Sequence, residues 1–290
     1  MTETSTEQIV YAVTDEGDLL AGLAIRPLPN RNKPVPIVWL PGFTINFYHP
    51  SFVLIGRHLA DLGYTFVIGN TRSHDVATNI WRPEPVGTGM TLNYGGYGGG
   101  MWERFSDSPH DVAAWIDLAM SLGFQSVVLV GHSYGAKKVV YYQTERQDPR
   151  VLGVILASGG VNPVTPDPEL MALAQRMVSE GRGEELLPWG SLQSFFTGTL
   201  SAQTYADPQR YVDLYGIHTS NPALARSGCP LLACCGTEDF MQPDDLNIIQ
   251  QKAIAAPRVD IKVFEGCGHG YETYEPEIAQ SFAAWIDTLI

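Results

Sequence analysis

A serine stands between two glycines in the run Gly-His-Ser-Tyr-Gly at residues 131–135. Four apolar residues, 127–130, precede the run, and a helical pattern, 136–142, follows it. This arrangement is typical of a sharp strand-to-helix turn that presents a nucleophilic hydroxyl at the edge of a sheet, with small neighbours that allow a strained backbone. We therefore interpret Ser133 as a nucleophile. The competing interpretation is a serine in an ordinary turn between a strand and a helix.

A serine hydroxyl is a weak nucleophile, so this chemistry requires a histidine base with a carboxylate behind it. On sheets that carry such a turn, the chain order is serine, acid, histidine. Asp239 and His269 satisfy that order, and each comes just after a continuous apolar run. We predict that Ser133, Asp239 and His269 form a catalytic triad, with Glu238 as the alternative acid.

Other histidines suit the role of base less well. His58 lies within a helical pattern, His110 lies in the first turn of a helix, and His132 belongs to the turn at the serine itself. Structural roles therefore fit these three better. His74 follows an apolar run and could line the site, but it precedes the serine in the chain.

The negative charge that develops on a substrate carbonyl oxygen requires two backbone N–H donors. One comes from the residue after the nucleophile, Tyr134, and the other from the loop that follows an earlier strand. That loop begins with Pro41 and Gly42. We predict that Phe43 and Tyr134 donate their N–H groups, with Thr44 as the second choice for the donor in the loop.

The elements that must position these residues alternate along most of the chain. Helical patterns cover residues 52–63, 108–123 and 277–290, and the segments that we interpret as buried strands cover residues 36–40, 65–70, 126–131, 151–159, 230–236 and 259–266. Strands that are apolar on both faces and separated by helices predict a mainly parallel sheet covered on both sides, which is an α/β fold. Residues 9–25 read as an antiparallel hairpin at one edge.

Two regions interrupt this alternation. The first, 73–105, contains a run rich in glycine and aromatic residues. It neither follows a strand nor opens a helix, and no lysine or arginine lies among its glycines, so we predict a long surface loop rather than a nucleotide site. The second, 161–228, is polar and helical, and we predict that it is an inserted cap over the end of the sheet where ligands bind.

The composition limits the classes of partner. The 290 residues are 44% hydrophobic and 17% charged, which is ordinary for a globular protein, and the formal net charge is −13. An acidic surface repels phosphate backbones and acidic membranes, so we expect neither nucleic acid nor membrane as a partner. The first residues lack the pattern of a secretory signal, and no apolar run is long enough to span a bilayer.

The four cysteines are Cys229, Cys234, Cys235 and Cys267. No CxxC pair occurs, and the His and Cys spacings do not provide a metal-ligand set, so we predict no metal. Two of the cysteines are adjacent within an apolar run, which indicates buried, reduced thiols. We therefore expect a cytoplasmic protein.

The motifs WLPGF, GHSYG, GTED and GCGHG occur in an order that resembles the α/β-hydrolase superfamily. The resemblance covers nearly all of the chain and implies an eight-stranded sheet, a Ser–Asp–His triad and no cofactor. Residues 1–160 and 229–290 would then form the core, and 161–228 the cap. More narrowly, the stretches VVLVGHSYGAKKVVYY and MALAQRMVSEGRGEELLP are similar to the siderophore-esterase-like branch of cytosolic esterases.

The predicted function is hydrolysis of a carboxylic ester or lactone of an apolar small molecule through an acyl-enzyme. Aromatic residues gather around the expected entrance, and we expect Tyr48, Trp102 and Trp189 to contact substrate, with Phe195 and Phe196 nearby in the cap. Two alternatives stay open: C–C bond or thioester hydrolysis on the same triad, and a slow-turnover small-molecule receptor. The exposed face of the cap is compatible with a homodimer.

Overall fold

The computed structural model describes residues 5–28, 31–87, 89–192 and 197–290. Within these residues, ten strands form one sheet in the order β10-β9-β8-β7-β3-β4-β2-β5-β6, and β1 pairs with β2. The strands are β1 (Ser5–Val13), β2 (Leu19–Pro27), β3 (Ile37–Leu40), β4 (Phe66–Gly69), β5 (Thr78–Val86), β6 (Gly89–Gly98), β7 (Val127–His132), β8 (Val151–Ala157), β9 (Leu231–Glu238) and β10 (Val259–Gly268).

The central strands run parallel, and their residues are apolar on both faces because both faces of a parallel sheet are covered. Every residue of β3, β4 and β7 is buried, and strands of this kind need a layer of helices on each side of the sheet. The pairs from β10 across to β4 are parallel, whereas β2 is antiparallel to β4 and to β1. The predicted α/β class and the predicted edge hairpin are confirmed.

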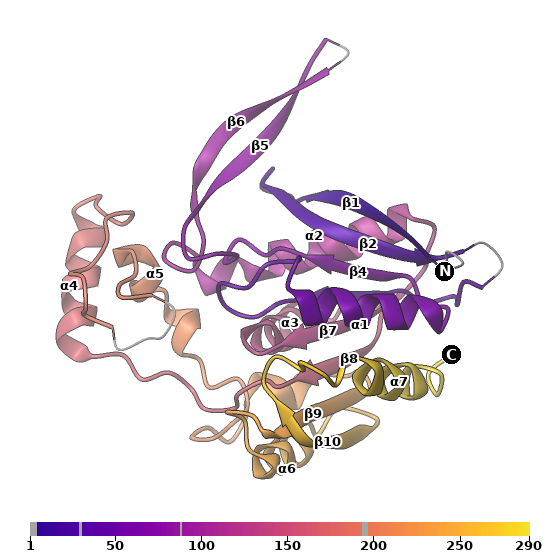
Figure 1. Cartoon of the computed structure of the whole chain (residues 1–290). Helices are drawn as coiled ribbons and strands as arrows, with labels where there is room; N and C mark the ends of the chain where they lie inside the picture. The colour runs from indigo at the N-terminus through magenta and orange to yellow at the C-terminus, as the bar shows by residue number, and fades with distance from the viewer. Residues whose placement is uncertain (1–4, 29–30, 88, 193–196) are drawn as a thin grey trace.

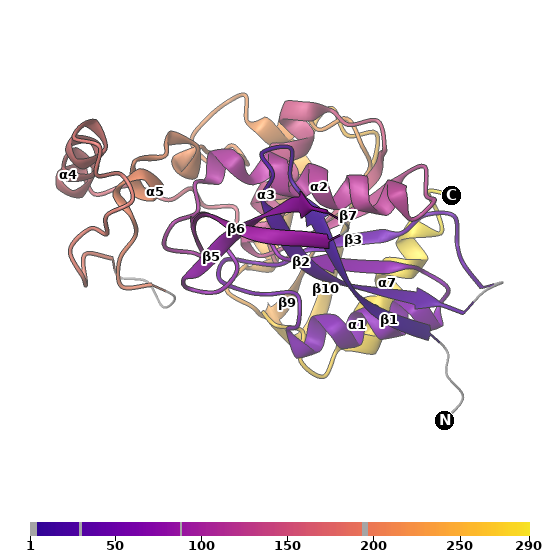
Figure 2. The same cartoon turned by 90° about the horizontal axis from the view of Figure 1, so that it is seen from above.

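Helices cover both faces of the sheet (Figures 1 and 2). On one face, α1 (Pro50–Asp61) and α7 (Glu275–Ile286) pack on a buried cluster that includes Trp39, Phe66 and Phe282. On the other face, α2 (Ser108–Ser121), α3 (Tyr134–Arg146) and α6 (Pro243–Lys252) pack on a second cluster that includes Trp115 and Leu129. In the described part of the chain, no helix is both long and apolar enough to cross a bilayer.

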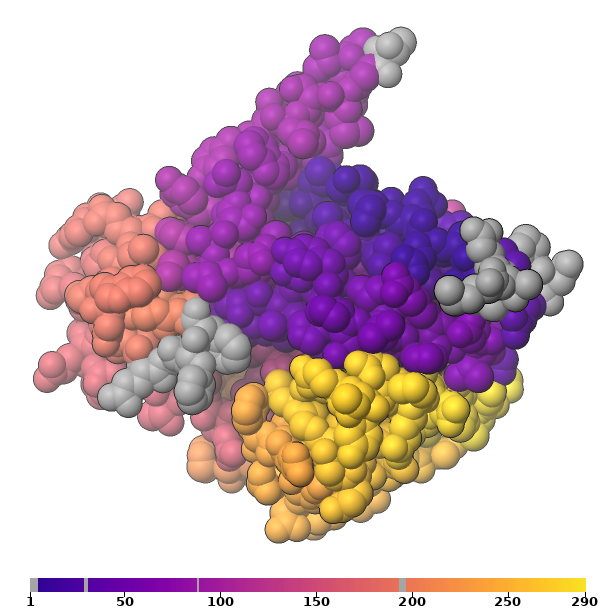
Figure 3. Space-filling model, in the orientation of Figure 1, coloured from indigo at the N-terminus to yellow at the C-terminus, as the bar shows by residue number. Residues whose placement is uncertain are grey.

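The region 73–105 differs from its prediction. It forms the hairpin β5–β6, which adds two strands to the eight that were expected, and then the short 3-10 helix η1 (Phe105–Asp107). The glycines that suggested a loop pair across the hairpin: Gly96 faces Ile80 and Gly98 faces Thr78. Figure 3 shows the hairpin projecting from the body as an arm.

The first part of the region 161–228 lies at one end of the sheet (Figure 1), whereas its last part packs on the helices, with Leu214 and Leu224 in the second sheet cluster. Its elements are α4 (Pro168–Ser179), α5 (Ala202–Ala206), and the 3-10 helices η2 (Pro208–Tyr211) and η3 (Ala223–Arg226). Asp167 caps α4 by accepting the N–H of Leu170 at 2.8 Å. A small apolar cluster, which includes Met177, Leu200 and Tyr205, packs apart from the two sheet clusters.

Candidate active site

Ser133 lies in the sharp turn between β7 and α3. Its backbone has φ 55° and ψ −119°, a conformation that is strained for any residue with a Cβ. Two hydrogen bonds hold this conformation: the Ser133 N–H donates to the carbonyl of Ala157 at 2.8 Å, and the Ala136 N–H donates to the carbonyl of Ser133 at 3.0 Å. The turn thus places Ser133 directly after the end of β7 and before the first residue of α3.

The two flanking glycines are required by close packing of the backbone. A Cβ at Gly131 would lie 2.4 Å from the carbonyl oxygen of Gly135, and a Cβ at Gly135 would lie 2.3 Å from that of Leu40. Both separations are far below van der Waals contact. The glycine spacing therefore serves a turn in which α3 packs directly on the end of β3.

Asp239 and His269 lie together beyond the ends of β9 and β10. His269 Nδ1 is 2.7 Å from Asp239 Oδ1, which also accepts the N–H of Met241 at 3.2 Å. The Asp239 carboxyl group is fully buried, whereas the alternative acid, Glu238, is exposed. Of the two carboxylates considered from the sequence, the structure brings Asp239 to the histidine.

The charge of Asp239 sets the state of the histidine ring. Burial raises the pKa of Asp239, but the hydrogen bonds of His269 and the adjacent Ser158 hydroxyl outweigh it and hold the pKa below its ordinary value. An ionised carboxylate at Nδ1 favours the tautomer with its proton on Nδ1. The other ring nitrogen of His269, Nε2, then carries the lone pair that a base needs.

Ser133 and His269 line the same cavity, which has a volume of about 90 Å³. Its other lining residues are Gly42, Phe43, Ile45, His49, Phe52, His132 and Gly270. Within the described residues, no hydrogen bond joins the Ser133 hydroxyl to the His269 ring. Such bonds are often long in enzymes without substrate and shorten when substrate binds.

The loop that was predicted to supply an oxyanion donor passes directly over the serine. A Cβ at Gly42 would lie 3.0 Å from Ser133 Cβ and 3.4 Å from its Oγ, so any larger residue would crowd the serine. The Thr44 N–H donates to the carbonyl of Ser73 at 3.1 Å, which removes Thr44 from consideration as a donor. Phe43 lines the cavity, and Tyr134 is the first residue of α3.

His132 contacts His269, a contact that was not predicted from the sequence. Its Nε2 lies 2.8 Å from the carbonyl oxygen of His269, and its ring packs on Trp39, Phe52 and Tyr271. Burial, together with the neighbouring His269, lowers the pKa of His132 to about 3. The ring is therefore neutral near pH 7 and donates its Nε2–H to that carbonyl.

A buried lysine joins α3 to the loop beyond β4. Lys138 Nζ donates to the hydroxyls of Thr71 at 2.7 Å and Ser73 at 2.8 Å, and it pairs with the carboxylate of Glu103. Both side chains of the ion pair are fully buried. Burial raises the pKa of Glu103, although Lys138 opposes that effect. Since the Ser73 carbonyl also accepts the Thr44 N–H, this network connects α3 with the loop after β3.

These last two contacts could not be found from the sequence. His132 and His269 are 137 residues apart, and Lys138 and Glu103 are 35 apart. Neither pair has a local pattern that indicates contact. The weak signal that did exist is a lysine within an otherwise apolar helical stretch at 138–142.

The three residues predicted to contact substrate do not line this cavity. Tyr48 is exposed and packs edge-on against Phe47, and Trp189 is exposed as well. Trp102 donates its indole N–H to the carbonyl of Glu184 at 2.9 Å and so anchors the segment at 184. Phe195 and Phe196 lie outside the described residues. Aromatic side chains from the loop after β3 and from α1, Phe43 and Phe52, form the apolar wall instead.

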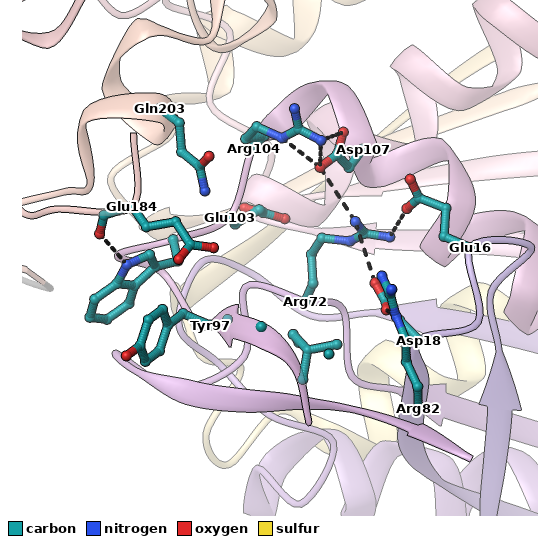
Figure 4. A pocket seen from close by; sticks show the side chains of 15 residues that line it. Glu16, Asp18, Arg72, Arg82, Tyr97, Glu103, Arg104, Asp107, Glu184 and Gln203 are labelled. Atoms are coloured by element: carbon teal, nitrogen blue, oxygen red, sulfur yellow. Dashed lines mark hydrogen bonds and ion pairs between the residues drawn. The ribbon is translucent and has the colours of Figure 1, made fainter. Parts of the chain in front are cut away.

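A second cavity, of about 280 Å³, lies beneath the base of the β5–β6 hairpin (Figure 4). Arg72 is its central cation and pairs with Asp111 at 2.9 Å, Glu16 at 3.0 Å and Asp107 at 3.4 Å. The other two arginines that line it are also paired: Arg82 with Asp18, and Arg104 with Asp107, each at 2.8 Å.

Metal and thiol chemistry find no support in the described residues. Among them, no group of three or more histidine, cysteine or acidic side chains is arranged to hold a metal ion. The four cysteines are buried and unpaired, and burial raises the pKa of Cys234, Cys235 and Cys267 to about 12 each. These thiols are therefore protonated and unreactive near neutral pH.

Comparison with known proteins gives a family and a fold. The model of the alpha/beta hydrolase family matches residues 37–279. No curated protein matches. Similar solved structures include Est1E from Butyrivibrio proteoclasticus, at 13% identity over 97% of this chain and 98% of that chain, with a TM-score of 0.65. Est1E has also been solved with ferulic acid bound.

Two further structures have the same fold. The Pyrococcus furiosus esterase Pf2001 is 13% identical over 98% of this chain and 91% of its own, with a TM-score of 0.58. The mouse alpha/beta hydrolase domain-containing protein 10 is 16% identical over 98% of this chain and 100% of its own, with a TM-score of 0.59. The narrower resemblance to siderophore esterases stays a prediction.

Proposed function

This chain belongs to the alpha/beta hydrolase family, and on that premise we propose that it is a serine hydrolase that cleaves a carboxylic ester or lactone through an acyl-enzyme. The observation that carries the proposal is the joint placement of three groups. The strained Ser133 turn and the His269 ring line one cavity, and Asp239 holds that ring at 2.7 Å.

In the first half of the proposed reaction, Ser133 Oγ attacks the carbonyl carbon while His269 Nε2 takes the hydroxyl proton. Asp239 stabilises the imidazolium that forms. The N–H groups of Phe43 and Tyr134 hold the oxyanion, and the positive end of α3 adds to this stabilisation. Loss of one such donor costs about 3–4 kcal/mol of transition-state stabilisation.

In the second half, His269 returns the proton to the alkoxide leaving group, and the acyl group stays on Ser133. A water molecule then gives a proton to His269 and attacks the acyl carbon. The acid is released and the serine regains its proton. This reaction sequence is proposed to run without a cofactor.

The cavity suggests which substrates would fit. It measures about 90 Å³ and its walls include Phe43, Ile45 and Phe52, whereas sites for drug-sized ligands measure about 300–1,000 Å³. We therefore propose an apolar acyl group of only a few carbons, with the alcohol portion outside the cavity. We assign the segment 161–228 as the cap because it has a small apolar cluster of its own at the end of the sheet.

Two further predictions from the sequence are kept as proposals. We propose a cytoplasmic location, which four buried and unpaired cysteines support because disulfides are rare in reducing compartments. A small-molecule ester or lactone is the proposed partner of the site, with neither nucleic acid nor membrane involved.

The experiment that tests the proposed function is hydrolysis of p-nitrophenyl esters with two to eight acyl carbons. We expect turnover to fall as the chain lengthens, and Ser133→Ala to lower kcat/KM by at least about 1,000-fold. Ser121→Ala, an exposed serine at the end of α2, is the matched control and should leave turnover unchanged. Full activity in Ser133→Ala would overturn the proposal, and equal rates for all acyl lengths would overturn the short-acyl assignment.

A further inference from the structure

The β5–β6 hairpin is a two-stranded arm that leaves the body of the molecule (Figures 1 and 3). Its strands pair in antiparallel register from Thr78 opposite Gly98 to Val86 opposite Gly89, with one irregularity between Ile80 and Trp81. An isolated two-stranded hairpin is only marginally stable in water and usually packs against another element. We therefore expect the outer part of this arm to pack against another surface.

The register divides the outer arm into two unlike faces. Residues directly opposite each other, and residues two apart on one strand, point to the same face. Trp81 pairs with Tyr94, Pro83 with Leu92, and Pro85 with Met90, so all six lie on one face, which we call the apolar arm face. The aromatic rings at its base touch edge to face, with centroids 6.4 Å apart.

The opposite face is mainly polar, apart from Val86 near the tip, and its base contacts the body. Arg82 pairs with Asn93 and Glu84 pairs with Thr91 across the strands. The Arg82 guanidinium donates to Asp18, in the turn between β1 and β2, at 2.8 Å. Because this ion pair directs the polar face inward, the body of the same chain does not cover the apolar arm face.

The apolar arm face is open to solvent. The exposed fractions are 40% for Trp81, 48% for Leu92, 55% for Tyr94 and 67% for Met90. An aromatic side chain buries about 150–250 Å² when it is fully covered, and smaller apolar side chains bury less. These six partly exposed side chains therefore offer roughly 500–600 Å² together. That is the upper end of what monomers expose, and patches of this size often mark interaction sites.

A second apolar surface lies on the edge strand β1, on the side of the molecule from which the arm rises (Figure 1). Ile9, Tyr11 and Val13 alternate along β1 on one face, with exposed fractions of 49%, 58% and 47%. We call these three residues the β1 stripe. Their face is that of α1, because Glu7, two residues before Ile9, accepts hydrogen bonds from Arg57 of α1.

We propose that a second copy of this chain covers the apolar arm face, in a two-fold dimer in which each arm packs on the β1 stripe of the other copy. Two arm faces packed against each other would bury about 1,100 Å², below the roughly 1,600 Å² of a standard stable interface. Two reciprocal contacts between arm and β1 stripe bury about 1,700 Å² and reach it.

The charge of the chain supports a protein partner over a membrane. The formal net charge is −13, which repels acidic lipid surfaces. The apolar arm face itself carries no charged side chain. Two copies can therefore meet there without bringing like charges into contact at the centre of the interface.

The test is the oligomeric state of the full chain, measured by sedimentation velocity between about 1 and 100 µM. We expect a dimer for the wild type. Leu92→Arg places a charge on the apolar arm face and should weaken dimerisation by at least about 100-fold, as a buried unpaired charge does in an interface. Thr91→Arg adds the same charge to the opposite, polar face of the arm and should leave the dimer intact.

A test variant and a matched control variant are available on the β1 stripe as well. Tyr11→Arg on the β1 stripe should weaken the dimer as Leu92→Arg does, whereas Gln8→Arg, exposed on the other face of β1, should not. Ester hydrolysis and the melting temperature of each variant report separately on folding. The proposal is overturned by a monomeric wild type, by dissociation in Thr91→Arg, by an intact dimer in Leu92→Arg or Tyr11→Arg, or by a monomer that floats with lipid vesicles.

Discussion

Two cavities of this protein differ in both size and chemistry. The smaller, of about 90 Å³, has apolar walls and contains Ser133 and His269. The larger, of about 280 Å³, is lined by arginines and carboxylates, with every arginine paired. In the first, a strained backbone holds the Ser133 hydroxyl at the same cavity as the His269 ring. The comparison teaches that the larger volume belongs to a network of ion pairs, whereas the smaller cavity brings the strained serine and the histidine together.

The larger cavity has a structural use. Arg72 donates its backbone N–H and its side chain to Asp111 of α2, and its guanidinium reaches Glu16 in the turn before β2. The next residue, Ser73, binds Lys138 of the serine helix. The charged network thus fixes the loop after β4, which contacts the helix that follows Ser133.

The largest expected effect is a difference in kcat/KM between a variant in the small cavity and a variant in the charged cavity. His269→Gln removes the proposed base and should lower kcat/KM by about 10,000-fold or more. Arg82→Ala removes an arginine from the charged cavity and should change kcat/KM by less than about twofold, because it touches none of the reacting groups. Steady-state hydrolysis of p-nitrophenyl acetate measures both, and comparable losses in the two variants would erase the distinction.

A slightly smaller effect is expected at the acid. Asp239→Asn keeps the shape of the side chain but favours the wrong tautomer of His269, so kcat should fall about 1,000- to 10,000-fold with little change in KM. Glu238→Gln is the matched control because Glu238 is exposed beside it. Should Glu238→Gln be the more damaging variant, the acid has been assigned to the wrong carboxylate.

The buried ion pair beneath the serine helix should affect stability more than any exposed pair. Lys138→Met leaves the Glu103 carboxyl group buried without its cation, which should lower the free energy of unfolding by about 3–5 kcal/mol. The double variant Lys138→Met/Glu103→Leu should recover most of that loss, because no uncompensated charge remains. Thermal and urea unfolding of the three proteins checks this, and additive losses in the double variant would contradict it.

The smallest effect concerns pH. His132 has a pKa of about 3 in the folded protein, so the unfolded chain takes up a proton below about pH 6.5 while the folded chain does not. Unfolding is then favoured as pH falls, and this group alone should lower the stability by about 2 kcal/mol between pH 6.5 and 5.

His132→Gln keeps an N–H donor for the His269 carbonyl and removes the titration. Its stability should therefore fall less steeply than that of the wild type over the same pH interval. Parallel pH profiles of the melting temperature for the two proteins would show that His132 is not the group responsible.

The features that could be predicted from sequence have local patterns. The turn at Ser133 follows from a strand, two glycines and a helix in succession, and the order of Asp239 and His269 follows from the apolar runs before them. The eight strands other than β5 and β6 have continuous apolar or alternating patterns. The structure places Ser133, Asp239 and His269 directly after β7, β9 and β10, at the carboxyl ends of these parallel strands.

The features that were missed depend on distant pairing or on glycine. The β5–β6 arm looked like a loop because its glycines hide an alternation that becomes plain only when Trp81 is set opposite Tyr94. Tyr48, Trp102 and Trp189 are aromatic residues near the expected entrance, but backbone direction places them elsewhere. The Lys138–Glu103 pair joins a helix to a residue before another helix, which no periodicity reveals.

The most direct test of the central claim is intact-mass analysis after exposure of the folded protein to a fluorophosphonate. A serine activated by His269 at the small cavity should give a single adduct, absent in Ser133→Ala and retained in Ser121→Ala. An adduct that persists in Ser133→Ala would place the reactive group elsewhere. A folded wild type that gives no adduct would contradict an assembled triad and favour a receptor that binds small molecules without turning them over.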